Sequence, residues 1–264
     1  MPDLPRALAF DLVVFDWAGT MVDFGCRAPV AALIAAFASH GVDLDEPTVR
    51  ADMGKAKADH VRALLARPEV ATAWTKAQGA PSSAADVTGL MAELEPLMRD
   101  AAAGASALIP GAAATVAELR RMGIKVASST GYTRQMMGPV MARAAEQGYA
   151  PDHLVCANET PAGRPSPLMI YKACAELGVW PLSRVVKVDD SEAGVTEGRN
   201  AGCFSVGLAA SGNGLGLSLE AYQALAASER EARLAPVRAS LTAAGADLVI
   251  DTVAELVPAL LGVR

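Results

Sequence analysis

Short apolar runs rich in β-branched residues alternate along the chain with longer segments in which apolar positions recur at helical spacing. Six runs are predicted to be strands: residues 11–15, 124–128, 154–157, 185–188, 204–208 and 248–250. Helices are predicted between them at residues 112–122, 134–147, 167–177 and 195–201. This alternation indicates an α/β fold, in which a Rossmann-like parallel sheet is wrapped by helices.

The stretch between the first and second predicted strands is too long for an ordinary crossover. Its pattern is helical throughout, with breaks at glycine and proline positions. We therefore expect an α/β core domain of residues 1–26 and 105–264, and an inserted all-helical domain of residues 27–104. Two amphipathic helices are also predicted between residues 218 and 243, leading into the last strand.

Composition narrows the class of protein. The 264 residues are 52% hydrophobic and 20% charged, which is typical of a globular chain. A net charge of −6 disfavours sequence-independent binding of nucleic acid. No apolar run is long enough to span a membrane, and no cleavable signal is expected at the N-terminus. The widely spaced cysteines are predicted to be reduced thiols of a cytoplasmic protein: Cys26, Cys156, Cys174 and Cys203.

The first candidate for chemistry is Asp16, which follows the first predicted strand within residues 15–20, Phe-Asp-Trp-Ala-Gly-Thr. The carboxyl edge of a parallel sheet is where α/β folds bind their ligands. An aspartate there could also simply cap the following turn. The segment resembles the first motif of the haloacid dehalogenase superfamily, Asp-x-Asp-Gly-Thr, in which the first aspartate attacks phosphorus. Ala18 stands where the superfamily's phosphatases have the acid that protonates a leaving alcohol.

Two more strand ends carry matching residues. Thr130 lies in residues 128–132, Ser-Ser-Thr-Gly-Tyr, and matches the superfamily's phosphoryl-binding hydroxyl, whereas Thr133 is suited to start a helix. Arg164, in Gly-Arg-Pro, stands where the superfamily usually has a lysine that neutralises the nucleophile and the phosphoryl oxygens. Arginine is permanently charged and can hold two oxygens at once.

The fourth strand end carries two adjacent carboxylates, Asp189 and Asp190. Adjacent carboxylates repel one another unless a cation lies close by, and a purely structural pair is the alternative. With Asp16 they could supply oxygen ligands for Mg²⁺. The resemblance implies that Asp190 binds the metal directly and Asp189 through water, with the backbone carbonyl of Ala18 as a further ligand.

Lys57 is the unusual residue of the predicted helical insert. A helix after Gly54 places Lys57 on the apolar face, together with His60, whereas Lys55 would point the other way and pair with Asp59. Most such lysines extend to solvent. A lysine whose pKa is lowered by burial can instead form an imine with an aldehyde, and the imine accepts the electrons of a departing carbanion.

These blocks together resemble the phosphonoacetaldehyde hydrolase family. The resemblance covers residues 15–20, 22–26, 53–64, 129–134, 161–165 and 197–202, and includes both the alanine in the first motif and the lysine in the insert. It implies a homodimer formed through the insert, and a small phosphonate as substrate.

The resemblance also implies a mechanism and the residues that carry it. Lys57 would form an imine with phosphonoacetaldehyde, Asp16 would attack phosphorus, and acetaldehyde and phosphate would be released. The implied catalytic residues are Asp16, Lys57, His60, Thr130 and Arg164. The implied substrate-binding or proton-relay positions are Ala18, Gly19, Cys26, Met53, Gly131 and Tyr132. Without the resemblance, His60 and Cys26 would be interpreted as packed core residues.

One difference from the family's motifs leaves alternative functions open. The family carries Gly-Asp-x-x-x-Asp in its fourth motif, whereas this chain has Asp189-Asp190 and Gly194 in place of the later aspartate. Glu192 could substitute for it. The alternatives are a Mg²⁺-dependent phosphatase or phosphomutase acting on a small phosphate ester, and, more remotely, a phosphate-binding module without catalysis. Ala18 disfavours the first, because an alcohol would leave without its acid.

Overall fold

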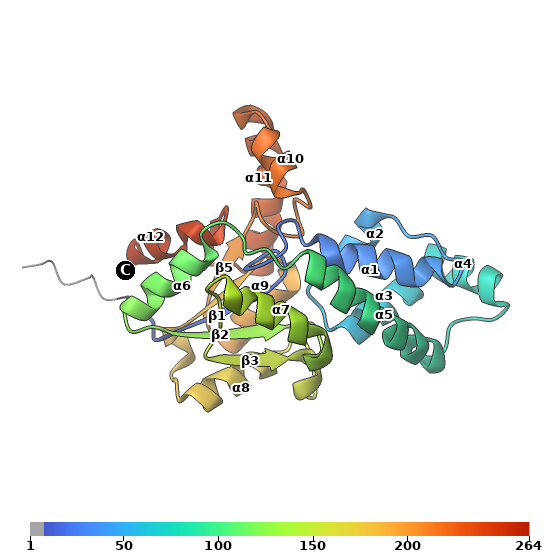
Figure 1. Ribbon diagram of the computed structural model, residues 1–264, viewed down its shortest axis with the longest axis horizontal. Coiled ribbons are helices and arrows are strands. Elements are labelled where there is room, and N and C mark those ends of the chain that lie inside the picture. Colours follow the sequence, from blue (N-terminus) through green and yellow to red (C-terminus); the bar gives the residue numbers. More distant parts are fainter. Residues whose placement is uncertain (1–7, 264) are drawn as a thin grey trace, which may run out of the picture.

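The computed structural model describes residues 8–263 and contains a six-stranded parallel sheet wrapped by helices (Figure 1). The strands are β1 (Leu12–Phe15), β2 (Lys125–Thr130), β3 (His153–Cys156), β4 (Val185–Asp189), β5 (Phe204–Leu208) and β6 (Leu248–Ile250). Their order is β3-β2-β1-β4-β5-β6, and every neighbouring pair is parallel. The order changes direction between β1 and β4, so the carboxyl ends of these strands mark the expected position of a ligand.

Helices cover both faces of the sheet. They are α6 (Ala112–Arg121), α7 (Arg134–Glu146), α8 (Leu168–Leu177), α9 (Glu192–Ala201), α10 (Leu219–Ala224), α11 (Ala227–Ala244) and α12 (Leu256–Leu261). Val13 of β1 shares one apolar cluster with α6, α7 and α12, whereas Leu12 and Val14 face a second cluster with α8. Because both of its faces are buried, β1 is apolar at every position, as its sequence predicts.

Five of the helices between β1 and β2 form the helical insert (residues 27–104) at one end of the sheet (Figure 1). They are α1 (Arg27–Ala38), α2 (Glu46–Arg50), α3 (Lys57–Ala66), α4 (Pro68–Gln78) and α5 (Ala84–Gly104). The long helix α5 packs against α1 and α3 within the insert and against α7 of the core. The expected helical segment is thus present, and its division from the core as a separate domain stays a prediction.

The insert contacts the core through the segment that precedes α3, at two glycines of the core. A Cβ atom at Gly131 would lie 2.5 Å from the carbonyl oxygen of Lys55, and one at Gly163 would lie 2.7 Å from the Cβ of Ala56. The backbone N–H of Lys57 donates a hydrogen bond to the carbonyl of Gly131 at 3.2 Å. Glycine at both positions therefore lets the insert backbone approach the strand ends closely.

Several element boundaries differ from the sequence-based expectation. β2 continues to Thr130, two residues further than predicted, because its polar side chains find buried partners. α9 begins at Glu192 rather than 195, since the Ser191 hydroxyl accepts the N–H of Gly194 and caps the helix. The two helices predicted within 218–243 are α10 and α11, and α12 was not predicted. No helix within residues 8–263 is long and apolar enough to cross a membrane.

Candidate active site

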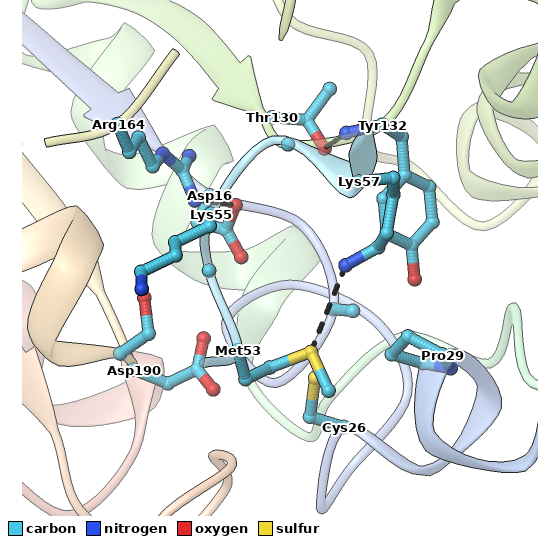
Figure 2. Close-up of a pocket in the computed structure, with 14 residues that line it drawn as sticks. Asp16, Cys26, Pro29, Met53, Lys55, Lys57, Thr130, Tyr132, Arg164 and Asp190 are labelled. Carbon is cyan, nitrogen blue, oxygen red and sulfur yellow. Dashed lines mark hydrogen bonds and ion pairs between the residues drawn. The ribbon is translucent and has the colours of Figure 1, made fainter. Parts of the chain in front are cut away.

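A pocket lies where the carboxyl ends of the strands meet the helical insert (Figure 2). It contains about 320 Å³ of space between atoms, its opening included. The lining residues come from both parts of the chain: Asp16, Ala18, Cys26, Pro29, Met53, Gly54, Lys55, Lys57, Thr130, Gly131, Tyr132, Arg164, Asp190 and Ser191. Most of the residues predicted to form the site therefore meet in one place.

Asp16 follows directly after β1 and is held by Arg164. Its backbone N–H bonds to the carbonyl of Val188 in β4, which fixes the residue at the sheet edge. Nη1 of Arg164 lies 2.8 Å from Oδ1 of Asp16. Burial raises the pKa of the Asp16 carboxyl above its ordinary value, and the guanidinium opposes this shift. The arginine thus stabilises the ionised form that a nucleophile needs.

Arg164 is itself fixed by four other contacts. Nε lies 3.0 Å from Oε2 of Glu197, and Nη2 donates to the carbonyl oxygen and the hydroxyl of Ser129 at 2.6 and 3.0 Å. Nη1 lies 3.3 Å from Oδ2 of Asp189. Opposite charges around the guanidinium outweigh its burial and raise its pKa, so it stays protonated. Its planar group is therefore fixed in one orientation.

Lys187 lies beside this arginine and completes a buried network of charges. Its Nζ lies 2.9 Å from Oδ2 of Asp189, 3.3 Å from Oε2 of Glu197 and 2.9 Å from the Ser129 hydroxyl. The motifs in the sequence predict no role for Lys187 or Glu197. The signal that could have found them is a lysine within the apolar run of β4, because a charged residue on a buried strand requires partners.

The site carries more buried negative than positive charge. Asp16, Asp189 and Asp190 place carboxylate oxygens within 4.8 Å of one another. Burial, together with repulsion from Asp16 and Asp189, raises the pKa of Asp190 well above its ordinary value. Four buried carboxylates surround two buried cations: Asp16, Asp189, Asp190 and Glu197 against Arg164 and Lys187. With these six ionised and Lys57 present as the free amine, the excess is two negative charges, so the donor set fits a divalent cation that prefers oxygen ligands.

The two adjacent aspartates have different surroundings. Asp190 accepts hydrogen bonds from the Thr20 hydroxyl at 3.1 Å and from the backbone N–H of Asn213 at 2.7 Å, and it lines the pocket. Asp189 lies beneath the pocket, where its Oδ1 accepts from the N–H and hydroxyl of Ser191. Burial opposes ionisation of Asp189, but Arg164 and Lys187 hold its pKa below the ordinary value. Gly19, which was predicted to belong to the site, does not line the pocket either. A Cβ atom at this position would lie 2.3 Å from Oδ2 of Asp190.

The structure accounts for Gly194, the departure in the fourth motif. A Cβ at this position would lie 1.9 Å from Cγ of Asp189, so the Asp189 side chain occupies the space that a side chain at 194 would need. The idea that Glu192 substitutes for the missing aspartate is wrong: Glu192 is exposed and accepts a hydrogen bond from Ser240 of α11. The carboxylate that lies in this space is that of Asp189.

Lys57 is the first residue of α3 and is buried on the face that the sequence predicts, with 3% of its surface exposed. Its ammonium lies 3.8 Å from the Met53 sulfur and 5.2 Å from the centre of the Tyr132 ring (Figure 2). Burial lowers the pKa of this lysine, although Cys26 and Asp16 oppose the shift. A lowered pKa increases the fraction of free amine, the form that attacks carbonyl groups.

The other predicted pocket residues line the wall around this amine. Thr130 ends β2, and its hydroxyl accepts the backbone N–H of Tyr132 at 3.2 Å, while Thr133 caps α7 as expected. Burial raises the pKa of the Tyr132 hydroxyl and of the Cys26 thiol well above their ordinary values, so both groups are neutral at pH 7. The pocket wall therefore offers neutral donors.

His60 is not among the residues that line the pocket. It is fully buried one turn beyond Lys57, and its Nε2 lies 2.8 Å from the carbonyl oxygen of Val49. Burial, with a contribution from the Lys57 charge, lowers its pKa to about 3, so the ring is neutral and Nε2 carries the proton that it donates to Val49. Nδ1 has no hydrogen-bonding partner among the described residues.

The expected pair between Lys55 and Asp59 is wrong. Lys55 bonds to Asp52 at 2.5 Å, and Asp59 bonds to Arg62 at 2.6 Å. The reason is that α3 begins only at Lys57, so Lys55 is not on the helix and the helical spacing does not apply to it.

Comparison with known proteins adds an independent line of evidence. The family model described as haloacid dehalogenase-like hydrolase matches residues 10–202. A phosphonoacetaldehyde hydrolase of Paraburkholderia phytofirmans is 44% identical over 93% of this chain and 92% of the relative. One of Syntrophobacter fumaroxidans is 43% identical over 90% and 86%. A crystal structure of a phosphonoacetaldehyde hydrolase-like protein from Oleispira antarctica superimposes with a TM-score of 0.94 at 37% identity, covering 98% of this chain and 95% of that one.

The fold and the site thus define a haloacid dehalogenase-like hydrolase, with an aspartate at the end of the first strand and acidic residues at the end of the fourth. The chain belongs, within this class, to the phosphonoacetaldehyde hydrolase family.

Proposed function

We propose that the chain hydrolyses the carbon–phosphorus bond of phosphonoacetaldehyde to acetaldehyde and phosphate. The observation that carries this proposal is the placement of Lys57 and Asp16 in one pocket, with an alanine at position 18. A buried amine and a carboxylate nucleophile suit a substrate that has an aldehyde at one end and phosphorus at the other. The membership of the family supports the same substrate.

In the proposed reaction the Lys57 amine condenses with the aldehyde, releasing water and forming a protonated imine. A carboxylate oxygen of Asp16 then attacks phosphorus, and the electrons of the breaking C–P bond move into the imine to give an enamine. Protonation of the enamine at carbon and hydrolysis of the resulting imine release acetaldehyde and restore the lysine. Water finally cleaves the aspartyl phosphate and frees phosphate.

The surrounding residues bind charge and orient the reacting groups. Arg164 holds Oδ1 of Asp16, which aims the carboxylate and neutralises charge on the phosphoryl oxygens. The Thr130 hydroxyl and the backbone around Gly131 line the same wall and are placed to bind those oxygens. Met53, Cys26 and Tyr132 surround the amine and keep it desolvated. His60 would act on Lys57 only indirectly, through the helix that carries both.

We propose Mg²⁺ as the metal of this site. Asp16, Asp190 and the backbone carbonyl of Ala18 would hold it, with Asp189 acting through water. The buried excess of two negative charges supports a divalent ion, and carboxylate oxygens suit magnesium. When bound, the ion would stabilise negative charge on the phosphoryl group.

A homodimer formed through the helical insert and a cytoplasmic location also belong to the proposal. The insert carries a groove between α1, α2 and α5 that is lined mainly by alanine and other apolar residues, which suits packing of helices. All four cysteines are free and buried, which fits a reducing compartment.

The proposal is tested by measuring acetaldehyde and phosphate from phosphonoacetaldehyde, in parallel with hydrolysis of simple phosphate monoesters. We expect the two products in equal amounts and little ester hydrolysis, because position 18 supplies no acid to a leaving alcohol. Lys57→Arg keeps the charge and cannot form an imine, so it should abolish the products, whereas Lys76→Arg on the exposed face of α4 should not. Ester hydrolysis that survives Lys57→Arg, with no cleavage of the phosphonate by the wild-type chain, would support the phosphatase alternative.

A further inference from the structure

Asn213 connects a carboxylate of the active site to the helical insert. It lies in the segment that follows β5, and 6% of its surface is exposed. Its backbone N–H donates to Oδ2 of Asp190 at 2.7 Å. Its side chain makes two bonds to Arg50, because Nδ2 donates to the backbone carbonyl of Arg50 at 3.0 Å and Oδ1 accepts from Nη1 at 3.1 Å. The core and the insert are therefore both held by one residue.

Arg50, at the end of α2, makes further contacts with the core side of this junction. Its Nη1 donates to the carbonyl of Gly25 at 3.0 Å, and its Nη2 donates to the carbonyl of Gly216 at 3.5 Å. Gly216 has a φ of +67°, and a Cβ there would lie 2.9 Å from Cζ of the arginine. A glycine at 216 therefore allows both the left-handed backbone and the close approach of the guanidinium.

The contacts between Arg50 and the core are directional hydrogen bonds to neutral groups. Apart from Asn213, the core acceptors are backbone carbonyls, and the only carboxylate bonded to Arg50 within the described residues is Glu46 of the insert itself. Hydrogen bonds of this kind require one relative position of the two parts, unlike a long-range attraction between charges. The contacts between Asn213 and Arg50 therefore form only when the insert is docked as observed.

We propose that Asn213 and Arg50 are positioning residues that couple docking of the insert to the placement of Asp190. This rests on the proposed function. Docking brings Lys57 into the pocket through its N–H bond to Gly131, and the same docked state fixes Asp190 through Asn213. The amine that activates the aldehyde and the acidic cluster that serves the phosphoryl end are thus assembled together. By reciprocity, an ion bound at Asp190 must favour docking as much as docking favours the ion.

Hydrogen–deuterium exchange without substrate tests this coupling. In the wild-type chain we expect saturating Mg²⁺ to slow exchange in the peptide covering residues 49–57 by at least about threefold, since coupling free energies of this kind correspond to factors of about 5 to 150. Asn213→Ala should remove this effect and weaken Mg²⁺ binding measured by calorimetry. Arg50→Lys tests the same point with Asn213 and Asp190 intact. It keeps the bond from Asn213 to the backbone carbonyl of residue 50 but loses the set of guanidinium bonds to the core, so the effect of Mg²⁺ should become smaller.

Glu46→Gln is the matched control. It removes the negative charge of the partner of Arg50 within the insert and leaves the bonds to the core, so the Mg²⁺ effect should persist. Persistence of the effect in folded Asn213→Ala, an undiminished effect in Arg50→Lys, or absence of the effect in the wild-type chain would overturn the proposal. If Asn213→Ala does not fold, Arg50→Lys decides. Failure of the wild-type chain to cleave the phosphonate, with magnesium-dependent protection retained, would overturn only the proposed function.

Discussion

The side chain of Asp189 occupies the space that a side chain at Gly194 would fill, with only 1.9 Å between Cγ and the position of the missing Cβ. Asp189 contacts Arg164 and Lys187, so we expect the two positions to be alternatives for one carboxylate beside these cations. We predict that Asp189→Gly and Gly194→Asp each destabilise the protein, the first by leaving buried cations short of a partner and the second by overpacking. Each should cost about 2 to 4 kcal/mol.

The double variant Asp189→Gly/Gly194→Asp should recover most of this loss. Urea unfolding of the two single variants and the double variant gives the interaction energy between the sites. Asp189→Gly/Gly194→Asn is the control, since it restores volume without charge and should not recover the loss. If the losses of unfolding free energy simply add in the double variant, the two positions are not alternatives for the same carboxylate.

The planar guanidinium of Arg164 contacts the nucleophile Asp16 and also the buried carboxylates of Asp189 and Glu197. We predict that Arg164→Lys lowers kcat by about 100-fold, because a single ammonium cannot bond Asp16, Glu197 and Ser129 together. Steady-state kinetics and urea unfolding of the same variant separate the effect on catalysis from the effect on folding. A lysine variant with normal kcat would show that charge alone is sufficient.

The pKa of Lys57 determines how we expect the activity to depend on pH. The fraction of Lys57 in the free-amine form increases as the pH rises through its pKa, and burial lowers that pKa below the ordinary value of 10.5. We therefore predict that kcat/KM increases with pH on the acid side and reaches a plateau below pH 10.5. A profile of kcat/KM that still rises tenfold per pH unit near pH 10 would contradict a lowered pKa.

His60 makes the folded protein sensitive to acid. Its pKa is about 3 in the folded state, against the ordinary value of 6.5 expected for the unfolded chain, so the unfolded chain binds a proton first as the pH falls. Its contribution to stability is complete above pH 6.5 and is lost between pH 6.5 and 3, at about 1.4 kcal/mol per pH unit. His60→Gln, which keeps a donor to Val49, should therefore lose about 2 kcal/mol less stability than the wild-type chain between pH 7 and pH 5. Equal losses in urea unfolding would contradict a neutral, buried histidine.

The sheet and the pocket could be predicted because their residues follow local rules. Apolar runs such as residues 12–15 mark buried strands, and the polar residues that follow them must meet at the carboxyl edge. Helical spacing alone predicted that Lys57 lies on the apolar face of its helix, where the structure shows it buried. The sequence was sufficient here because each inference needed only one element at a time.

The remaining features depend on contacts between distant parts of the chain. Nothing near Asn213 in the sequence indicates that it contacts both Asp190 and Arg50, which are 23 and 163 positions away. The failed pair of Lys55 with Asp59 has a different cause, because it assumed a helix start two residues too early.

Reductive trapping tests the central claim, that Lys57 forms an imine with the substrate. Borohydride is added to the protein with phosphonoacetaldehyde and Mg²⁺, and the modified peptide is mapped by mass spectrometry. We predict an ethyl group on Lys57 in the wild-type chain, and a phosphonoethyl group in Asp16→Asn, in which the C–P bond stays intact. Release of acetaldehyde and phosphate by the wild-type chain with Lys57 unmodified would contradict the imine mechanism.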